Sequence, residues 1–166
     1  MLRLFLVGSL LILAGCSGGR STAGSGSADA VECAPFARQV SGIALYGDAA
    51  SWWEQAQGRY PRSAAPSAGG VLVFQRSARL PAGHVSVVAR LVSDREIRVT
   101  QANWVHHRIT RDEPIVDVSP GNDWSQVRVW WDPVRGLGNT VYRAYGFIIP
   151  TNARSRGDLL AGVAEP

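Results

Sequence analysis

The strongest constraint on the fold is a series of short β-type segments that fills the second half of the sequence. In each segment apolar residues, many of them Val or Ile, alternate with polar ones, and turns rich in Pro, Gly or charged residues separate the segments. Such alternation is typical of strands that bury one face. The predicted strands cover residues 71–76, 84–92, 97–109, 126–131 and 142–149.

The residues before these strands have helical spacing. Apolar residues recur every three to four positions over 31–46, and Pro35 restricts the helix start to residues 33–34, because proline fits only a first turn. Gly47 is the predicted end, and Asp48 is expected to cap a second, short helix. Helices followed by strands indicate an α+β fold, with the N-terminal helices packed on an antiparallel β-sheet.

The N-terminal segment has the features of an export signal. Arg3 precedes the apolar residues 4–13, which are too few to span a bilayer, and the sequence Leu-Ala-Gly-Cys follows. This ending resembles the bacterial lipobox, which implies a signal peptide over residues 1–15 and lipid on Cys16. Ser17 would then favour the outer membrane of a Gram-negative cell. A simple signal peptide with an incidental cysteine is the alternative.

Composition divides the remaining chain into one domain and two flexible segments. The lipidated cysteine and a Gly- and Ser-rich linker occupy 16–30, the domain occupies 31–150, and 151–166 is a flexible tail. A hydrophobic content of 46% excludes global disorder. The net charge of +4 comes from dispersed arginines, which predicts no nucleic-acid partner. We expect a monomer in the cell envelope, facing the periplasm and tied to the membrane through its lipid anchor.

Cys33 is a candidate nucleophile. The chain has two cysteines, so lipid on Cys16 would leave Cys33 without a partner in an oxidising compartment, where structural cysteines come in pairs. The start of a helix favours a thiolate, because backbone N–H groups and the positive end of the helix dipole lie there. We therefore expect a reactive thiol with a depressed pKa.

His84 and Asn103 are candidate partners of this thiol. His84 opens a predicted strand directly after a glycine-containing turn, and Asn103 lies in the next predicted strand. In a hairpin that turns at residues 94–95, opposed positions have numbers that add to about 187–189, so His84 falls opposite Asn103 or its neighbour. A nucleophile at a helix start, with a base and an amide on adjacent strands, suits cysteine acyl-transfer chemistry.

Six stretches of the sequence together indicate a known family: ECAPFAR (32–38), GDAASWW (47–53), GGVLVF (69–74), GHVSVV (83–88), QANW (101–104) and GFIIP (146–150). On these stretches the sequence resembles the CHAP domain family, the papain-like cysteine, histidine-dependent amidohydrolases and peptidases of bacterial and phage cell-wall enzymes. The resemblance implies a papain-like fold and no metal or cofactor. It also implies that Cys33 attacks a carbonyl carbon, His84 transfers the proton and Asn103 holds the imidazole in its working tautomer.

Two positions depart from the family pattern. Gln101 stands where the family often has Glu, and on a strand it shares a face with Asn103, so we interpret it as a helper. Glu32 stands where the family often has Gln, and a carboxylate cannot donate a hydrogen bond to an oxyanion. The backbone N–H of Cys33 would then stabilise the oxyanion.

These observations predict a peptidoglycan hydrolase, either an N-acetylmuramoyl-L-alanine amidase or an endopeptidase. One alternative is a catalytically weak or inactive lipoprotein that binds the wall or a partner protein. Another is an NlpC-type wall peptidase, although ECAPFAR lacks the Asp-Cys-Ser-Gly stretch usual there. Trp104 is expected to pack over the catalytic pair or to form the floor of the cleft. His106 and His107 would face opposite sides of a strand, which argues against a shared metal.

Overall fold

The computed structural model describes residues 31–151. The predicted signal peptide, the lipidation site Cys16, the linker and the tail after residue 151 lie outside the described residues. Within the described part of the chain, no helix has the length and apolar character that a membrane span requires.

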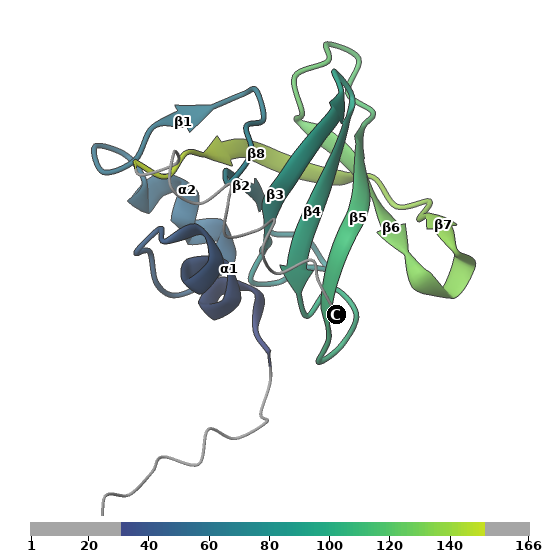
Figure 1. The fold of residues 1–166 in the computed structure, drawn as a ribbon, viewed down its shortest axis with the longest axis horizontal. Coiled ribbons are helices and arrows are strands. Elements are labelled where there is room, and N and C mark those ends of the chain that lie inside the picture. The colour runs from purple at the N-terminus through teal and green to yellow at the C-terminus, as the bar shows by residue number, and fades with distance from the viewer. Residues whose placement is uncertain (1–30, 152–166) are drawn as a thin grey trace, which may run out of the picture.

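Antiparallel strands are the main secondary structure of the described chain. They run in the order β1-β8-β2-β3-β4-β5-β6-β7, and β8 also pairs with β6, which closes the sheet into a barrel (Figure 1). The strands are β1 (Arg62–Ser63), β2 (Val71–Phe74), β3 (His84–Ser93), β4 (Glu96–Ala102), β5 (Ile109–Asp117), β6 (Gln126–Trp131), β7 (Gly136–Leu137) and β8 (Tyr142–Ile148).

The predicted papain-like α+β fold, with helices packed on an antiparallel β-sheet, is therefore wrong. The structure is mostly a closed antiparallel β-barrel with two short helices. Closure depends on the pairs Gln126↔Arg143 and Val127↔Tyr142 between β6 and β8. Residues 97–109 were predicted as one strand, but they form most of β4, the β4–β5 loop and the first residue of β5. The unpredicted strand β5 pairs with β4 on one side and with β6 on the other, and so connects β4 to the strand that meets β8.

The helices are shorter than predicted. Helix α1 (Cys33–Ser41) starts at the expected residue but ends at Gly42, which has a left-handed φ of 73°, and not at Gly47. Beyond Gly42 the side chains of Ile43 and Leu45 are buried while those between and after them are exposed, so the apolar pattern there belongs to extended chain. The second predicted helix is a 3-10 turn, η1 (Ala49–Ser51), followed by α2 (Trp52–Gln55).

Two apolar clusters lie on opposite faces of β2 and β3. One cluster packs Ala34 and Ala37 of α1 against Val85 and Val87 of β3. The other fills the inside of the barrel and includes Val88. Because side chains alternate along a strand, the even-numbered positions of β3 face the barrel interior and the odd-numbered ones face α1.

The β3–β4 hairpin has the predicted register. Val87 lies opposite Thr100 and Leu91 opposite Ile97, so the numbers of opposed residues add to between 187 and 189 throughout the hairpin. The predicted continuation of β4 to residue 109 is wrong, however. Asn103 follows the strand with a left-handed φ of 58°, and its backbone N–H donates to the carbonyl of Arg108 at 2.8 Å, which closes a tight β4–β5 loop.

Gly83, in the turn before β3, packs closely against Ala50 of η1. We therefore expect Gly83→Ala to destabilise the protein. Its φ is +74°, and an added Cβ would lie 2.6 Å from the Cβ of Ala50 and 2.7 Å from its backbone nitrogen. Gly58→Ala is the matched control, since Gly58 has a φ of +72° but open space around it. Urea unfolding should show that Gly83→Ala costs about 1–3 kcal/mol more than Gly58→Ala. Equal losses would contradict this packing.

Candidate active site

Cys33 lies at the first position of α1, half-buried and free of any disulfide. Burial raises the pKa of its thiol above the ordinary value. The backbone N–H of Val85 opposes this rise in pKa, while the nearby carboxylate of Glu32 adds to it. The expected depressed pKa is therefore wrong, because burial outweighs the N–H groups around the thiol.

The start of α1 is held against the β4–β5 loop by Asn103. The side-chain Nδ2 of Asn103 donates to Oε2 of Glu32 at 3.1 Å, and its Oδ1 accepts from the backbone N–H of His107 at 2.9 Å. Figure 1 shows α1 and the β4–β5 connection at the same end of the barrel. Asn103 thus fixes the position of the residue that precedes Cys33.

His84, the first residue of β3, is almost completely buried, with 3% of its surface exposed. Its Nε2 lies 3.1 Å from Oε1 of Gln101. The ring packs edge-on against Phe74 and Trp104, with centroid distances of 5.5 and 5.0 Å. Burial lowers the pKa of His84 from 6.5 to about 4, although the Gln101 hydrogen bond opposes this. The imidazole is consequently neutral at pH 7.

Gln101 determines which nitrogen of His84 carries the proton. An amide oxygen only accepts hydrogen bonds, so Nε2 of His84 is the protonated nitrogen and Nδ1 is the basic one. The same Oε1 accepts from Ser86 Oγ at 2.6 Å, and Nε2 of Gln101 donates to Glu113 at 2.8 Å. All polar atoms of this buried amide side chain are thereby engaged with protein partners.

The structure brings the predicted residues to one end of the barrel but pairs them differently. Cys33 packs against the apolar cluster that contains Val85, the residue directly after His84, and the backbone N–H of Val85 lowers the pKa of the thiol. Among the hydrogen bonds of residues 31–151, none joins the thiol to the imidazole. Such contacts are often long in enzymes without substrate and tighten when substrate binds.

Gln101, and not Asn103, contacts His84. Continuing the hairpin register from the pair Val87↔Thr100 places Gln101 opposite Ser86. His84 is two residues before Ser86 on the same strand face, so it is the diagonal neighbour of Gln101. Asn103 lies beyond the end of β4 in a left-handed conformation, so the predicted face shared by positions 101 and 103 does not exist.

Three polar residues around Gln101 were missed by the sequence analysis: Ser86, Thr110 and Glu113. Thr110 and Glu113 lie on β5, which was not predicted as a separate strand. The sequence carries no clear signal for them, because the buried face of β5 carries the charged residues Glu113 and Asp117 on either side of Ile115, and hydrophobic alternation places charged residues on an exposed face.

Trp104 forms one wall of the histidine pocket. Its indole packs against His84 and, at a centroid distance of 5.0 Å, against Tyr142. Its Nε1 donates to the carbonyl of Trp130 at 3.0 Å, which fixes the ring. The aromatic environment keeps water from His84 and explains the burial that lowers the histidine pKa.

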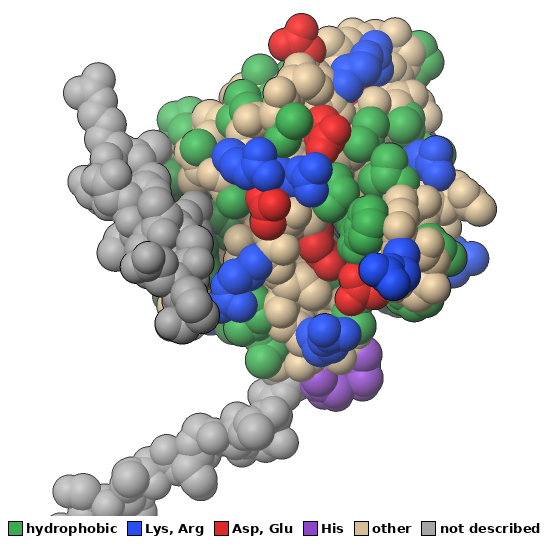
Figure 2. Space-filling model, turned by 45° about the vertical axis from the view of Figure 1, so that its right-hand side comes forward, with side chains coloured by type: hydrophobic (Ala, Val, Ile, Leu, Met, Phe, Trp, Pro, Cys, Tyr) green, Lys and Arg blue, Asp and Glu red, His purple; other side chains and the backbone are tan. Residues whose placement is uncertain are grey.

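The predicted separation of His106 and His107 is wrong. Their rings lie 3.7 Å apart, because both residues belong to the β4–β5 loop and His107 has a φ of 57°. They form the exposed histidine patch at one end of the molecule in Figure 2. Within residues 31–151, no group of three or more His, Cys, Asp or Glu side chains is arranged to hold a metal ion.

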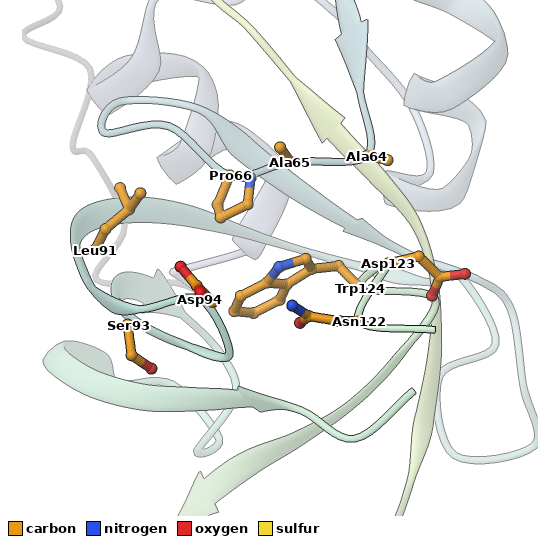
Figure 3. Close-up of a pocket in the computed structure, with 9 residues that line it drawn as sticks. All are labelled: Ala64, Ala65, Pro66, Leu91, Ser93, Asp94, Asn122, Asp123 and Trp124. Carbon is orange, nitrogen blue, oxygen red and sulfur yellow. The ribbon is translucent and has the colours of Figure 1, made fainter. Parts of the chain in front are cut away.

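A separate hollow lies at the other end of the barrel. It has a volume of about 400 Å³ and is lined in part by Leu91, Asp94 and Trp124 (Figure 3). Asp94 belongs to the β3–β4 turn, whereas the candidate site is at the opposite end of β4. The hollow is thus remote from Cys33.

The buried, neutral His84 predicts a particular pH dependence of stability. Its folded pKa of about 4 lies below the ordinary 6.5, so the unfolded chain binds the proton first as the pH falls. The free energy of unfolding should decrease between pH 6.5 and 4, by about 3 kcal/mol at most, and level off below that. Urea unfolding at several pH values should show a shallower decrease for His84→Gln. The same pH dependence in both proteins would contradict the assignment.

One family model matches the chain, and its range covers the candidate site. The model of the CHAP domain family matches residues 22–103, a range that includes Cys33, His84, Gln101 and Asn103. No curated protein matches the chain. CHAP domains are generally amidohydrolases or peptidases, and the family is associated with peptidoglycan hydrolysis. The chain belongs to the CHAP domain family.

Proposed function

We propose that this protein hydrolyses an amide bond in peptidoglycan, with Cys33 as nucleophile and His84 as general base. The observation that carries the proposal is the placement of Cys33 against Val85, the residue that follows His84 in the chain, together with a neutral His84 whose Nε2 is bonded to Gln101. Membership of the CHAP family supports the reaction class. In this proposal Gln101, and not Asn103 as the resemblance implied, orients the imidazole of His84.

The reaction begins with both groups uncharged, since burial raises the Cys33 pKa and lowers the His84 pKa. Nδ1 of His84 takes the thiol proton as the sulfur bonds to the substrate carbonyl carbon. The imidazolium keeps its hydrogen bond to Gln101 and then gives the proton to the leaving amine as the C–N bond breaks. A water molecule, deprotonated by His84, cleaves the resulting thioester and restores the thiol.

The oxyanion of this reaction forms close to the start of α1. The first backbone N–H groups of a helix have no partner within it, so the N–H of Cys33 is available as a donor. Glu32 cannot supply a second donor, because its carboxylate only accepts and is bonded to Asn103. Asn103 therefore acts on the geometry of the helix start and not on the imidazole.

The scissile bond is either the amide between sugar and stem peptide or a peptide bond within the stem or cross-bridge. Lipid on Cys16 and the linker that follows would keep the domain close to the membrane, on the periplasmic side of the envelope. The substrate would then be the layer of peptidoglycan within reach of that membrane.

A binding protein without turnover is the second candidate function. The raised thiol pKa favours it, because a protonated thiol is a weaker nucleophile than a thiolate. A lipoprotein of this kind would recognise the wall with the same surface but would release no fragments.

Digestion of purified sacculi separates these functions. The lipid-free chain should release soluble fragments, and Cys33→Ala should lower the rate at least about 10³-fold. Mass spectrometry would show free stem peptides for an amidase and shortened or uncrosslinked muropeptides for an endopeptidase. If both proteins sediment with the wall and neither releases fragments, the protein is a binding lipoprotein and the hydrolase proposal is wrong.

Alkylation of Cys33 tests the protonation state on which the mechanism depends. In a Cys16→Ser chain, the iodoacetamide rate should stay low at neutral pH and rise only above the ordinary thiol pKa of 9.0. The unfolded chain serves as the reference for an ordinary thiol. A high, pH-independent rate between pH 5 and 7 would instead demonstrate a thiolate–imidazolium pair and would contradict the neutral starting state.

A further inference from the structure

Glu113 is a buried acidic residue of β5 that the reaction above does not use. Its exposed fraction is 7%, and among the ion pairs of residues 31–151 none involves it. One oxygen, Oε2, accepts from Thr110 Oγ1 at 2.6 Å and from Gln101 Nε2 at 2.8 Å. Two donors converge on this oxygen, so it acts as an acceptor. Burying a carboxylate with neutral partners is costly, which calls for an explanation in terms of function.

The orientation of the Gln101 amide is the property that Glu113 can control. The oxygen and nitrogen ends of a glutamine amide have nearly the same shape, and Gln101 is completely buried, so packing distinguishes them poorly. In the observed orientation the amide oxygen faces His84 and Ser86. In the reversed orientation the amide oxygen would face Oε2 of Glu113, and two acceptors would be in contact without a proton.

Glu113 is the partner of Gln101 that discriminates between these orientations. The hydroxyl of Ser86 can donate or accept, and a neutral imidazole at His84 can also do either, depending on its tautomer. Neither group therefore determines which end of the amide faces it. The carboxylate of Glu113 only accepts, and the 2.8 Å bond from Gln101 Nε2 satisfies it in one orientation alone.

We propose that Glu113 is a positioning residue that fixes the Gln101 amide and thereby keeps the proton of His84 on Nε2. Nδ1 then remains free to accept the proton of Cys33. With the amide reversed, its NH₂ group would donate to Nε2, the proton would move to Nδ1, and the base would be lost. The catalytic meaning of this inference rests on the proposed function, but the tautomer of His84 does not depend on turnover.

Two readouts on the full chain test the inference. NMR of ¹⁵N-labelled protein reports which imidazole nitrogen of His84 carries the proton, and sacculus digestion reports the rate. The wild-type protein should show the Nε2–H tautomer. Glu113→Gln should populate the Nδ1–H tautomer and lower the maximal rate roughly 10- to 100-fold, with the half-saturating sacculus concentration unchanged.

Asp117→Asn is the matched control. Asp117 is also a buried carboxylate of β5, with 2% exposed, but it bonds to the backbone N–H of Ser119 and pairs with Arg95 at the other end of the strand. This variant removes a buried charge without touching Gln101. It should keep the Nε2–H tautomer and the wild-type maximal rate per folded molecule.

A double variant provides the rescue. Gln101→Glu combined with Glu113→Gln exchanges the acid and the amide between the two positions. The carboxylate then at position 101 accepts from His84 Nε2, Ser86 and the new amide, while that amide's oxygen accepts from Thr110. The double variant should restore the Nε2–H tautomer and recover most of the rate lost in Glu113→Gln.

The possible outcomes separate this inference from the proposed function. An Nδ1–H tautomer in the wild-type protein overturns the inference whether or not any variant folds. An unchanged tautomer in Glu113→Gln, or a rate loss that Asp117→Asn reproduces, also overturns it. A tautomer change in Glu113→Gln together with a wild-type protein that releases no fragments would support the positioning role and refute the hydrolase function.

Discussion

The hydrogen bond between Nε2 of His84 and Oε1 of Gln101 is the contact on which the site depends. It joins two neighbouring strands inside the barrel, where an unpaired polar atom would be costly, so both side chains are held in a single arrangement. It also fixes the tautomer of His84, because it leaves Nδ1 as the only basic nitrogen of the ring. In the proposed reaction, this polar contact leaves Nδ1 of His84 as the atom that accepts the proton.

The barrel and helix α1 contribute different residues to the candidate site. β3 presents alternate residues to its two faces, so His84 belongs to the barrel interior while Val85 meets the thiol of Cys33 on α1. Burial affects both titratable groups in the same sense, because each is held in its uncharged form. In the proposed reaction the pair therefore transfers a proton during attack and does not start as an ion pair.

Sequence reasoning found the local features of this protein and missed those that depend on the whole sheet. The start of α1, the β3–β4 register and the positions of Cys33 and His84 followed from proline placement, alternation and turn length. Closure of the barrel was not predicted, because nothing in the sequences of β6 and β8 indicates that these two strands pair with each other. The amide at His84 was misassigned because a left-handed Asn103 ends the strand two residues beyond Gln101.

Detection of a covalent intermediate on Cys33 tests the central claim most directly. Wild-type protein mixed with soluble peptidoglycan fragments, quenched in acid and digested, should yield the Cys33 peptide with the mass of a thioester-linked acyl group. The identity of that acyl group would also establish which bond is cleaved. Release of fragments without any adduct on Cys33, under conditions in which a thioester survives the quench, would contradict nucleophilic catalysis by this residue.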